Sequence, residues 1–340
     1  MIKPIYSPAS ERYASGMKYR RCGKSGILLP EISLGFWHNF GDVNTLSNSM
    51  EIVHYAFDNG IVHFDLANNY GPSYGSAEET FGIIMDKSLR PYRDELFISS
   101  KAGYDMWPGP YGNWGSRKYL MASINQSLSR MKIDYVDLFY SHRYDPETPL
   151  EETLQALVDI VRQGKALYVG ISRWPYEAAC VAYEYLAARD VPCLIYQDKY
   201  NIFDRTPEMN GTLEQAKVNG AGFICFSPLA QGLLTDRYLN GVPKDSRMAR
   251  GGSLSQDTLD EGTLSCIGAL NSIAVQRGQT LAEMALAWVL ANPQVTSVIV
   301  GASSVEQLEK NIKATSSPAF EEEELSEIDR LCRSVKGLCL

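Results

Sequence analysis

The sequence predicts an α/β protein, a (β/α)8 TIM barrel with an N-terminal hairpin before the barrel and a C-terminal helix after it. Eight short apolar runs alternate with helical patterns along the chain. Most of these runs are continuous rather than alternating, which is typical of parallel strands covered on both faces. The alternative is a doubly wound nucleotide-binding sheet, but no GxGxxG motif joins a strand to a helix. We therefore expect a single barrel domain over residues 1–340.

Apolar, β-prone segments define the expected strands. They cover residues 32–36, 61–67, 96–102, 136–142, 166–172, 194–197, 222–228 and 297–303. Apolar spacing of three and four residues predicts helices between them. These helices cover residues 46–59, 77–85, 117–131, 150–163, 177–188 and 280–291. Thr148 is expected to cap the fourth helix, with Pro149 in its first turn.

The remaining segments lie outside this repeat. Residues 1–16 are expected to form a loose N-terminal arm, and residues 17–32 a hairpin that turns at residues 23–26. Residues 229–278 are long for one connection, so they are expected to hold a functional loop and an extra helix. Residues 321–334 predict one acidic amphipathic helix that follows the barrel.

Composition excludes several classes of function. The formal net charge of -8 and the lack of a basic block argue against a nucleic-acid surface. No apolar stretch is long enough for a membrane span, and the N-terminus lacks the pattern of a signal peptide. Seven scattered cysteines without a CxxC pair indicate reduced thiols and a cytoplasmic protein. No metal-ligand spacing is present.

Three successive strands end in residues suited to proton transfer. Asp65, with Tyr70 five residues later, ends the second strand, Lys101 ends the third and His142 ends the fourth. Strand ends of a barrel open on one face, so these four side chains are expected to converge. Lys101 would lower the pKa of Tyr70, and Asp65 would hold Lys101 in place. Tyr70 could then act as a general acid toward a carbonyl oxygen, with His142 orienting the substrate.

The alternative is that Asp65 and Lys101 form a buried structural pair, with Tyr70 and His142 only at the rim. Four suitable residues on three adjacent strand ends favour a catalytic site. None of them can carry out redox chemistry alone, so a cofactor must supply a hydride. Residues 226–232 and 301–307 follow the last two strands, where barrels commonly bind phosphate, and Arg247 could reach a further phosphate.

The motifs at these positions resemble those of the aldo-keto reductases over nearly the whole chain. They are Phe64-Asp65-Leu66-Ala67 with Tyr70-Gly71, Ser100-Lys101, His142-Arg143, Gly170-Ile171-Ser172, Ser227-Pro228-Leu229 and Gly301-Ala302-Ser303. The resemblance implies NADP(H) as cofactor and Asp65, Tyr70, Lys101 and His142 as the catalytic tetrad. It implies a cofactor cleft lined by Trp37, Asp65, Ser172, Arg173, Gln197, Ser227, Leu229, Gln231, Gly232, Arg237, Arg247, Gly301, Ser303, Gln307 and Asn311. The substrate would lie against Trp37, Tyr70, His142, Arg143 and Trp107.

Finer motifs at residues 67–72, 101–112 and 231–235 resemble the bacterial L-glyceraldehyde 3-phosphate reductases, a subgroup similar to the potassium-channel β-subunits. The resemblance implies reduction of small aldehydes or ketones, such as L-glyceraldehyde 3-phosphate or methylglyoxal. It is also compatible with a homo-oligomer. The alternative is an NADP(H)-binding regulatory subunit with slow turnover. A third hypothesis is a barrel isomerase that needs no cofactor. The chain departs from the pattern at Lys310, where relatives carry Glu near the adenine, at Asp198 and at residues 236–238.

An aromatic loop follows the third expected strand. It contains Tyr104, Trp107, Tyr111 and Trp114. These side chains could wall a pocket and exclude water from hydride transfer. They could equally pack on a neighbouring subunit, and the sequence does not decide between the two.

Overall fold

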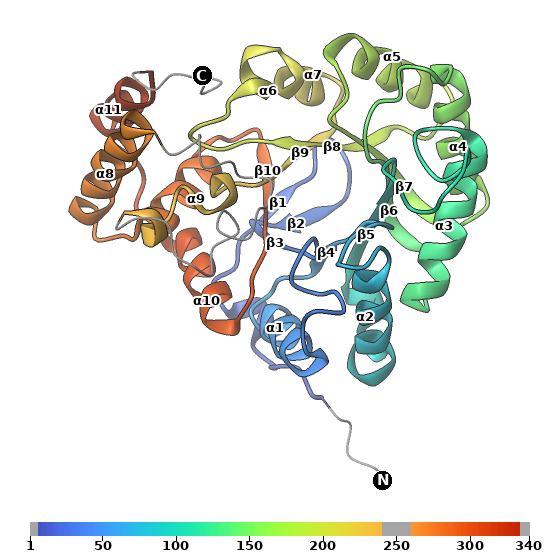
Figure 1. The fold of residues 1–340 in the computed structure, drawn as a ribbon, viewed down its shortest axis with the longest axis horizontal. Coiled ribbons are helices and arrows are strands. Elements are labelled where there is room, and N and C mark those ends of the chain that lie inside the picture. Colours follow the sequence, from blue (N-terminus) through green and yellow to red (C-terminus); the bar gives the residue numbers. More distant parts are fainter. Residues whose placement is uncertain (1–5, 240–259, 334–340) are drawn as a thin grey trace.

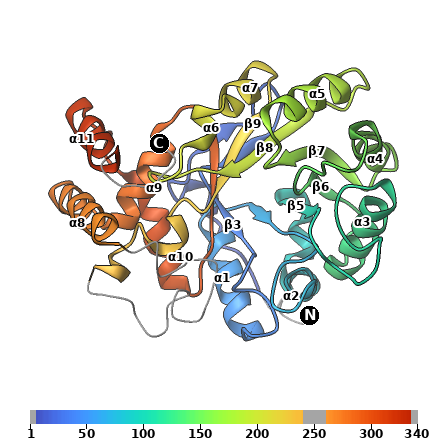
Figure 2. The same cartoon turned by 45° about the horizontal axis from the view of Figure 1, so that its top comes forward.

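The computed structural model describes residues 6–239 and 260–333. Within these residues, eight parallel strands close into a barrel in the order β10-β3-β4-β5-β6-β7-β8-β9. Helices surround the barrel, as Figures 1 and 2 show. The strands are β3 (Ile32–Gly35), β4 (His63–Asp65), β5 (Phe97–Ala102), β6 (Val136–Ser141), β7 (Ala166–Ser172), β8 (Cys193–Lys199), β9 (Gly222–Phe226) and β10 (Val295–Val300). This confirms the barrel prediction and excludes the doubly wound sheet.

The helices follow the expected pattern closely. They are α1 (Leu46–Asp58), α2 (Ser76–Ile84), α3 (Arg117–Met131), α4 (Leu150–Arg162), α5 (Tyr176–Ala187), α6 (Thr206–Met209), α7 (Thr212–Val218), α8 (Glu261–Gln276), α9 (Leu281–Ala291), α10 (Val305–Lys313) and α11 (Glu322–Arg333). The helices predicted with bounds agree within one residue at each end. The short helices α6 and α7 were not predicted, since so few residues carry little periodicity. The extra helix α8 packs beside the C-terminal helix α11 (Figure 1).

The N-terminal hairpin is present and closes one end of the barrel. Its strands β1 (Tyr19–Arg21) and β2 (Leu28–Pro30) pair antiparallel. Cys22 and Leu29 from the hairpin join the apolar cluster inside the barrel, together with Ile195 and Ile224. A separate and larger core lies between the strands and the helices. Since the hairpin fills the amino-terminal end, the carboxyl ends of the strands are left to form the mouth.

The predicted cap of α4 is wrong. Thr148 does not cap α4, because the residue at the cap position is Pro149, which offers no side-chain hydrogen bond. Instead, Asp145 accepts hydrogen bonds from the backbone N–H groups of Glu147 and Thr148 and so fixes the turn before the helix.

The described part of the N-terminal arm, residues 6–16, is not loose. The Tyr6 hydroxyl donates to Asp58 at 2.8 Å, and Arg12 forms an ion pair with Glu95 at 2.6 Å. These contacts join the segment to α1 and to the residues that precede β5. The expectation failed because the apolar content of a segment does not reveal side-chain anchors of this kind.

Candidate active site

Asp65 and Lys101 form a buried ion pair at the barrel mouth. Asp65 is the last residue of β4, and Lys101 is the last but one of the neighbouring strand β5. Lys101 Nζ lies 2.5 Å from Asp65 Oδ2 and also donates to the Leu66 carbonyl at 2.7 Å. Asp65 is 2% exposed and Lys101 is fully buried. Charges at such depth need each other, because an isolated one would be very costly.

Tyr70 and His142 complete the group of four. The Tyr70 hydroxyl lies 3.4 Å from Lys101 Nζ and 3.5 Å from His142 Nε2. Backbone hydrogen bonds to Ala67 and from Ala77 hold the Tyr70 backbone in the loop after β4. His142 directly follows β6, the strand beside β5. The structure therefore brings all four predicted catalytic residues together.

The electrostatics of Tyr70 differ from the prediction. Burial raises the pKa of Tyr70 well above its usual value, and the negative charge of Asp65 adds to the effect. Lys101 was expected to lower this pKa. Its charge is largely compensated by Asp65, which lies much closer to it than the Tyr70 hydroxyl does. Burial also lowers the pKa of Lys101, partly offset by Asp65. Tyr70 thus keeps its proton at neutral pH and is available as a donor.

His142 is neutral at physiological pH. Burial lowers its pKa well below the usual value, and the positive charges of Lys101, Arg143 and Arg173 act in the same direction. Its Nδ1 atom is buried without a hydrogen-bond partner in the described part of the chain. A neutral imidazole can donate a hydrogen bond through Nε2 while Nδ1 carries the lone pair.

Tyr104 is a mouth residue that the sequence did not single out. Its ring packs edge-on against His142, with 4.7 Å between ring centroids, and its hydroxyl lies 3.4 Å from an Arg173 nitrogen. The Arg143 guanidinium stacks over the rings of Tyr104 and Trp114 and donates to Asn113. Tyr104 was recognised only as one of four aromatic residues in the loop. Its position directly after the strand residue Ala102 and Gly103 is the signal that could have distinguished it.

Trp37 and Trp107, both predicted to contact substrate, differ in their surroundings. The Trp37 carbonyl accepts a hydrogen bond from the Gly71 N–H, next to Tyr70. Trp107 packs on Tyr119 of α3, with 5.0 Å between ring centroids. Trp37 stacks on His38 and is 42% exposed. Trp37 is therefore still accessible from solvent, whereas Trp107 helps to anchor the aromatic loop to α3.

The predicted cofactor residues on β7 and β8 adjoin the tetrad. Gln197, near the end of β8, donates to Asp65 Oδ1 at 3.3 Å. Ser172, the last residue of β7, is 1% exposed, and its hydroxyl has no hydrogen-bond partner among the described residues. Arg173 follows with a positive φ of 55°. Buried hydroxyls are rarely left unpaired, so Ser172 is a candidate ligand contact.

The loop after β9 has an unusual backbone. Ser227, Ala230 and Gln231 have φ values of 53°, 46° and 58°, which non-glycine residues seldom adopt. Such strain concentrates at functional sites. Gly232 (φ 102°) continues the loop, and Leu229 packs at the edge of the outer core. Arg237 is exposed further along.

The predicted residues after β10 surround the start of α10. Ser303 donates to the Gln307 side chain through both its backbone N–H and its hydroxyl, at 2.9 and 3.0 Å. Gly301, Ser303 and Gln307 are exposed, whereas Asn311 is 3% exposed and its Nδ2 atom lacks a partner in the described chain. Arg247 lies outside the described residues.

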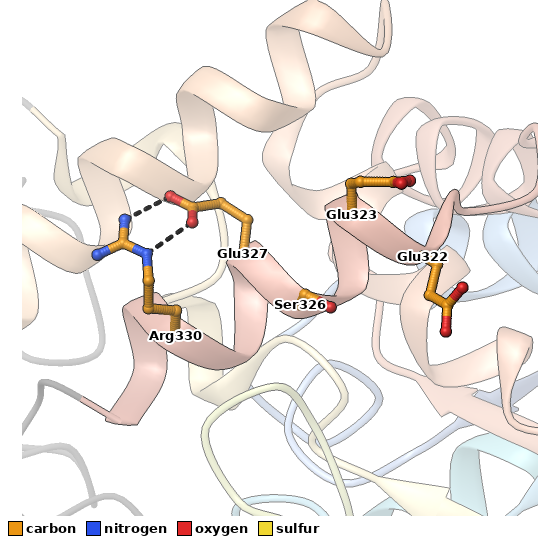
Figure 3. A pocket seen from close by; sticks show the side chains of 5 residues that line it. All are labelled: Glu322, Glu323, Ser326, Glu327 and Arg330. Atoms are coloured by element: carbon orange, nitrogen blue, oxygen red, sulfur yellow. Dashed lines mark hydrogen bonds and ion pairs between the residues drawn. The ribbon is translucent and has the colours of Figure 1, made fainter.

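A hollow on the outer surface is unrelated to this site. It is lined by residues of α11 alone, and Figure 3 shows their side chains along that helix. Glu327 and Arg330 pair with each other, and the other charged lining residues are Glu322 and Glu323. This acidic helix surface contains none of the tetrad residues. Within residues 6–239 and 260–333, no group of three or more potential metal ligands is found, nor a helix long and apolar enough to cross a membrane.

A closed barrel of parallel strands, with an ion pair, a tyrosine and a histidine meeting at its mouth, defines a (β/α)8 enzyme equipped for proton transfer. The chain belongs to the aldo/keto reductase family, whose model matches residues 31–333. It is therefore an oxidoreductase that acts on aldehydes, in a family that generally uses NAD(P)H.

Three similar proteins are reductases or a channel subunit by name. The chain is 55% identical over 324 residues to an L-glyceraldehyde 3-phosphate reductase of Escherichia coli O157:H7, which covers 94% of this chain and 93% of the relative. It is 54% identical to the protein of the same name in Escherichia coli K12, with the same coverage. It is 36% identical over 304 residues to a probable voltage-gated potassium channel subunit beta of Arabidopsis thaliana, covering 88% and 91% of the two chains.

Proposed function

We propose that this protein is an NADPH-dependent reductase of small aldehydes, with L-glyceraldehyde 3-phosphate, methylglyoxal or a similar compound as substrate. The observation that carries the proposal is the position of the Tyr70 hydroxyl, which lies between the Lys101 ammonium and the neutral His142. A proton donor held between a cation and a hydrogen-bond donor suits protonation of a carbonyl oxygen.

The residues of the chain have distinct roles in this proposal. Tyr70 and His142 Nε2 would both donate hydrogen bonds to the carbonyl oxygen and so orient the substrate. Tyr70 would give its proton to that oxygen, and Lys101 would stabilise the phenolate that remains. Asp65 keeps Lys101 charged despite its burial. When bound, NADPH would supply the hydride.

Residues at the end of β7 and on and before α10 suit such a cofactor. The buried Ser172 hydroxyl and the Asn311 amide nitrogen both lack partners in the described chain, which is expected of groups that bind a ligand. The exposed Ser303 at the start of α10 suits a phosphate group. The remaining residues of the cleft predicted from the family resemblance are part of the proposal, with Arg247 as the expected partner of a ribose phosphate.

The substrate side of the mouth carries positive charge. Arg143 and Arg173 both adjoin Tyr104, although the formal net charge of the whole chain is -8. A phosphorylated aldehyde, which is what the name of the 55% identical relative indicates for that protein, would be attracted to these side chains. Small ketones could share the same site.

We also propose that residues 1–340 form one domain and that the protein is cytoplasmic. The six cysteines within the described residues are all free, which agrees with a reducing compartment. A homo-oligomer stays part of the proposal because the aromatic loop exposes Tyr111 and Trp114. The second candidate function is an NADP(H)-binding regulatory subunit with slow turnover, favoured by the similarity to a probable channel β-subunit.

Replacement of Tyr70 tests the proposal directly. Tyr70→Phe keeps the ring but removes the proton donor, so kcat should fall by at least about a hundredfold, while NADPH binding is kept. Steady-state NADPH oxidation with a panel of small aldehydes measures this. Tyr168→Phe, the same change on β7 outside the mouth cluster, should leave kcat unchanged.

Two outcomes would count against the proposal. A near-wild-type kcat for Tyr70→Phe would remove Tyr70 from the mechanism. Tight NADPH binding by the wild-type protein, without turnover of any aldehyde in the panel, would favour the regulatory subunit.

A further inference from the structure

A chain of hydrogen-bonded side chains inside the barrel leads to Asp65. Ser297 Oγ lies 2.6 Å from Ser33 Oγ, which lies 2.8 Å from His63 Nδ1. His63 Nε2 lies 3.1 Å from Ser99 Oγ, and the Ser99 hydroxyl donates to Asp65 Oδ1 at 2.7 Å. The three serines and the histidine are all fully buried. The catalytic scheme above does not use any of them.

The direction of every hydrogen bond in this chain follows from its last acceptor. A carboxylate only accepts, so the single hydroxyl proton of Ser99 goes to Asp65. His63 Nε2 must then donate to Ser99, and its Nδ1 accepts the proton of Ser33. This arrangement requires a neutral imidazole, in agreement with burial, which lowers the pKa of His63 to about 4. All donors therefore point toward Asp65, and such bonds strengthen one another.

The strand geometry explains why these residues meet. His63 and Asp65 are two residues apart on β4, and Ser99 and Lys101 are two residues apart on β5, so each pair shares one face of its strand. The register places Asp65 opposite Ser99. Ser100, between Ser99 and Lys101, points to the other face, and its hydroxyl donates to Glu78 on α2 at 2.6 Å.

We propose that Ser99 and His63 are positioning residues for the reductase reaction, because they fix the Asp65 carboxylate so that its second oxygen holds Lys101 beside Tyr70. This inference rests on the proposed function of the tetrad. The Gln197 amide also donates to Asp65 Oδ1, at the longer distance of 3.3 Å. Ser99 is therefore the principal neutral donor to this oxygen, and His63 acts on Asp65 only through Ser99.

A matched pair of serine variants tests the role of Ser99. Ser99 and Ser100 are both fully buried, and both donate to a carboxylate. Ser99→Ala should lower kcat about tenfold, the size expected for one hydrogen bond to a charged group. KM and the NADPH dissociation constant should stay within about twofold of wild type. Ser100→Ala should lower stability to a similar degree but leave kcat unchanged, because its hydroxyl faces α2.

The role of His63 is tested by a second pair of variants. His63→Leu removes the donor to Ser99, so kcat should fall about as much as in Ser99→Ala. His63→Gln keeps an N–H donor near the Nε2 position and should restore kcat to within about threefold of wild type. The double variant His63→Leu with Ser99→Ala should be no slower than Ser99→Ala alone, since His63 acts through Ser99.

The outcomes separate this inference from the function on which it rests. If Tyr70→Phe keeps full activity, the proposed function fails whatever the serine variants do. If Tyr70→Phe is inactive but folded Ser99→Ala has wild-type kcat, the positioning role is overturned. Equal losses of kcat in Ser99→Ala and Ser100→Ala would also overturn it. Additive losses in the double variant would show that His63 acts by another route.

Discussion

The two sides of the barrel mouth are built differently. On the side of β4, β5 and β6, buried groups contact one another directly. Lys101 forms an ion pair with Asp65 and lies beside the Tyr70 hydroxyl, which in turn lies beside His142. On the side of β10, Ser303 and Gln307 are exposed and bond to each other. Ionisable groups taken out of water must be compensated by the fold itself. Exposed polar groups keep their hydration until a ligand arrives.

The largest expected effect comes from removing one member of the buried ion pair between Asp65 and Lys101. Lys101→Met leaves the Asp65 charge buried without its partner, so the free energy of unfolding should fall by about 3–5 kcal/mol. Activity should fall by about a thousandfold or more, because the Tyr70 phenolate loses the Lys101 ammonium beside it. Denaturant unfolding and NADPH oxidation measure the two effects.

The double variant provides the control for this experiment. Asp65→Asn combined with Lys101→Met removes both charges, so most of the lost stability should return, while activity should stay as low as in Lys101→Met. If the stability losses of Asp65→Asn and Lys101→Met simply add in the double variant, the two charges do not stabilise each other. The buried side of the mouth would then not differ from the exposed side in this respect.

A smaller effect on the same side appears with pH. The pKa of His63 is about 4 in the folded protein and about 6.5 in an unfolded chain. The unfolded state therefore binds more protons between these values, and stability falls as the pH drops through this window, by up to about 3 kcal/mol. The lowered pKa of His142 contributes with the same sign. Urea unfolding at pH 7 and pH 5 should show a weaker pH dependence for His63→Gln than for wild type. Identical pH dependence in the two proteins would contradict a neutral, buried His63.

That the four predicted residues lie together was predictable from sequence, because the strand ends of a barrel lie on one face. Asp65, Lys101 and His142 end three successive strands, so the fold class alone brings them together. The direction of the pKa shift at Tyr70 was not predictable. It depends on the depth of burial and on how closely Asp65 compensates Lys101, and neither is visible in a sequence.

His63 and Ser99 were missed although a signal was present. Both lie in runs that were recognised only as buried strands. Each stands two residues before a predicted catalytic residue, and alternation along a strand places such residues on the same face. The anchored arm at residues 6–16 could not be inferred in this way. For Tyr104, the position after β5 was visible in the sequence, but its contacts were not. Both sets of contacts depend on loop geometry and on partners such as Asp58 and His142 that are far away in the sequence.

The smallest expected effect lies on the exposed side and compares two adjacent serines. Ser304 caps α10 by accepting a hydrogen bond from the Gln307 N–H, whereas the Ser303 hydroxyl is exposed and donates to the Gln307 side chain. Ser304→Ala should therefore lower the free energy of unfolding by about 1 kcal/mol. Ser303→Ala should weaken NADPH binding about threefold to tenfold, the size of one neutral hydrogen bond, with stability and kcat unchanged. Fluorescence titration with NADPH and denaturant unfolding of both variants measure the difference. If Ser303→Ala binds NADPH as tightly as wild type, this serine serves only the local turn, and the cofactor is held by other groups at the mouth.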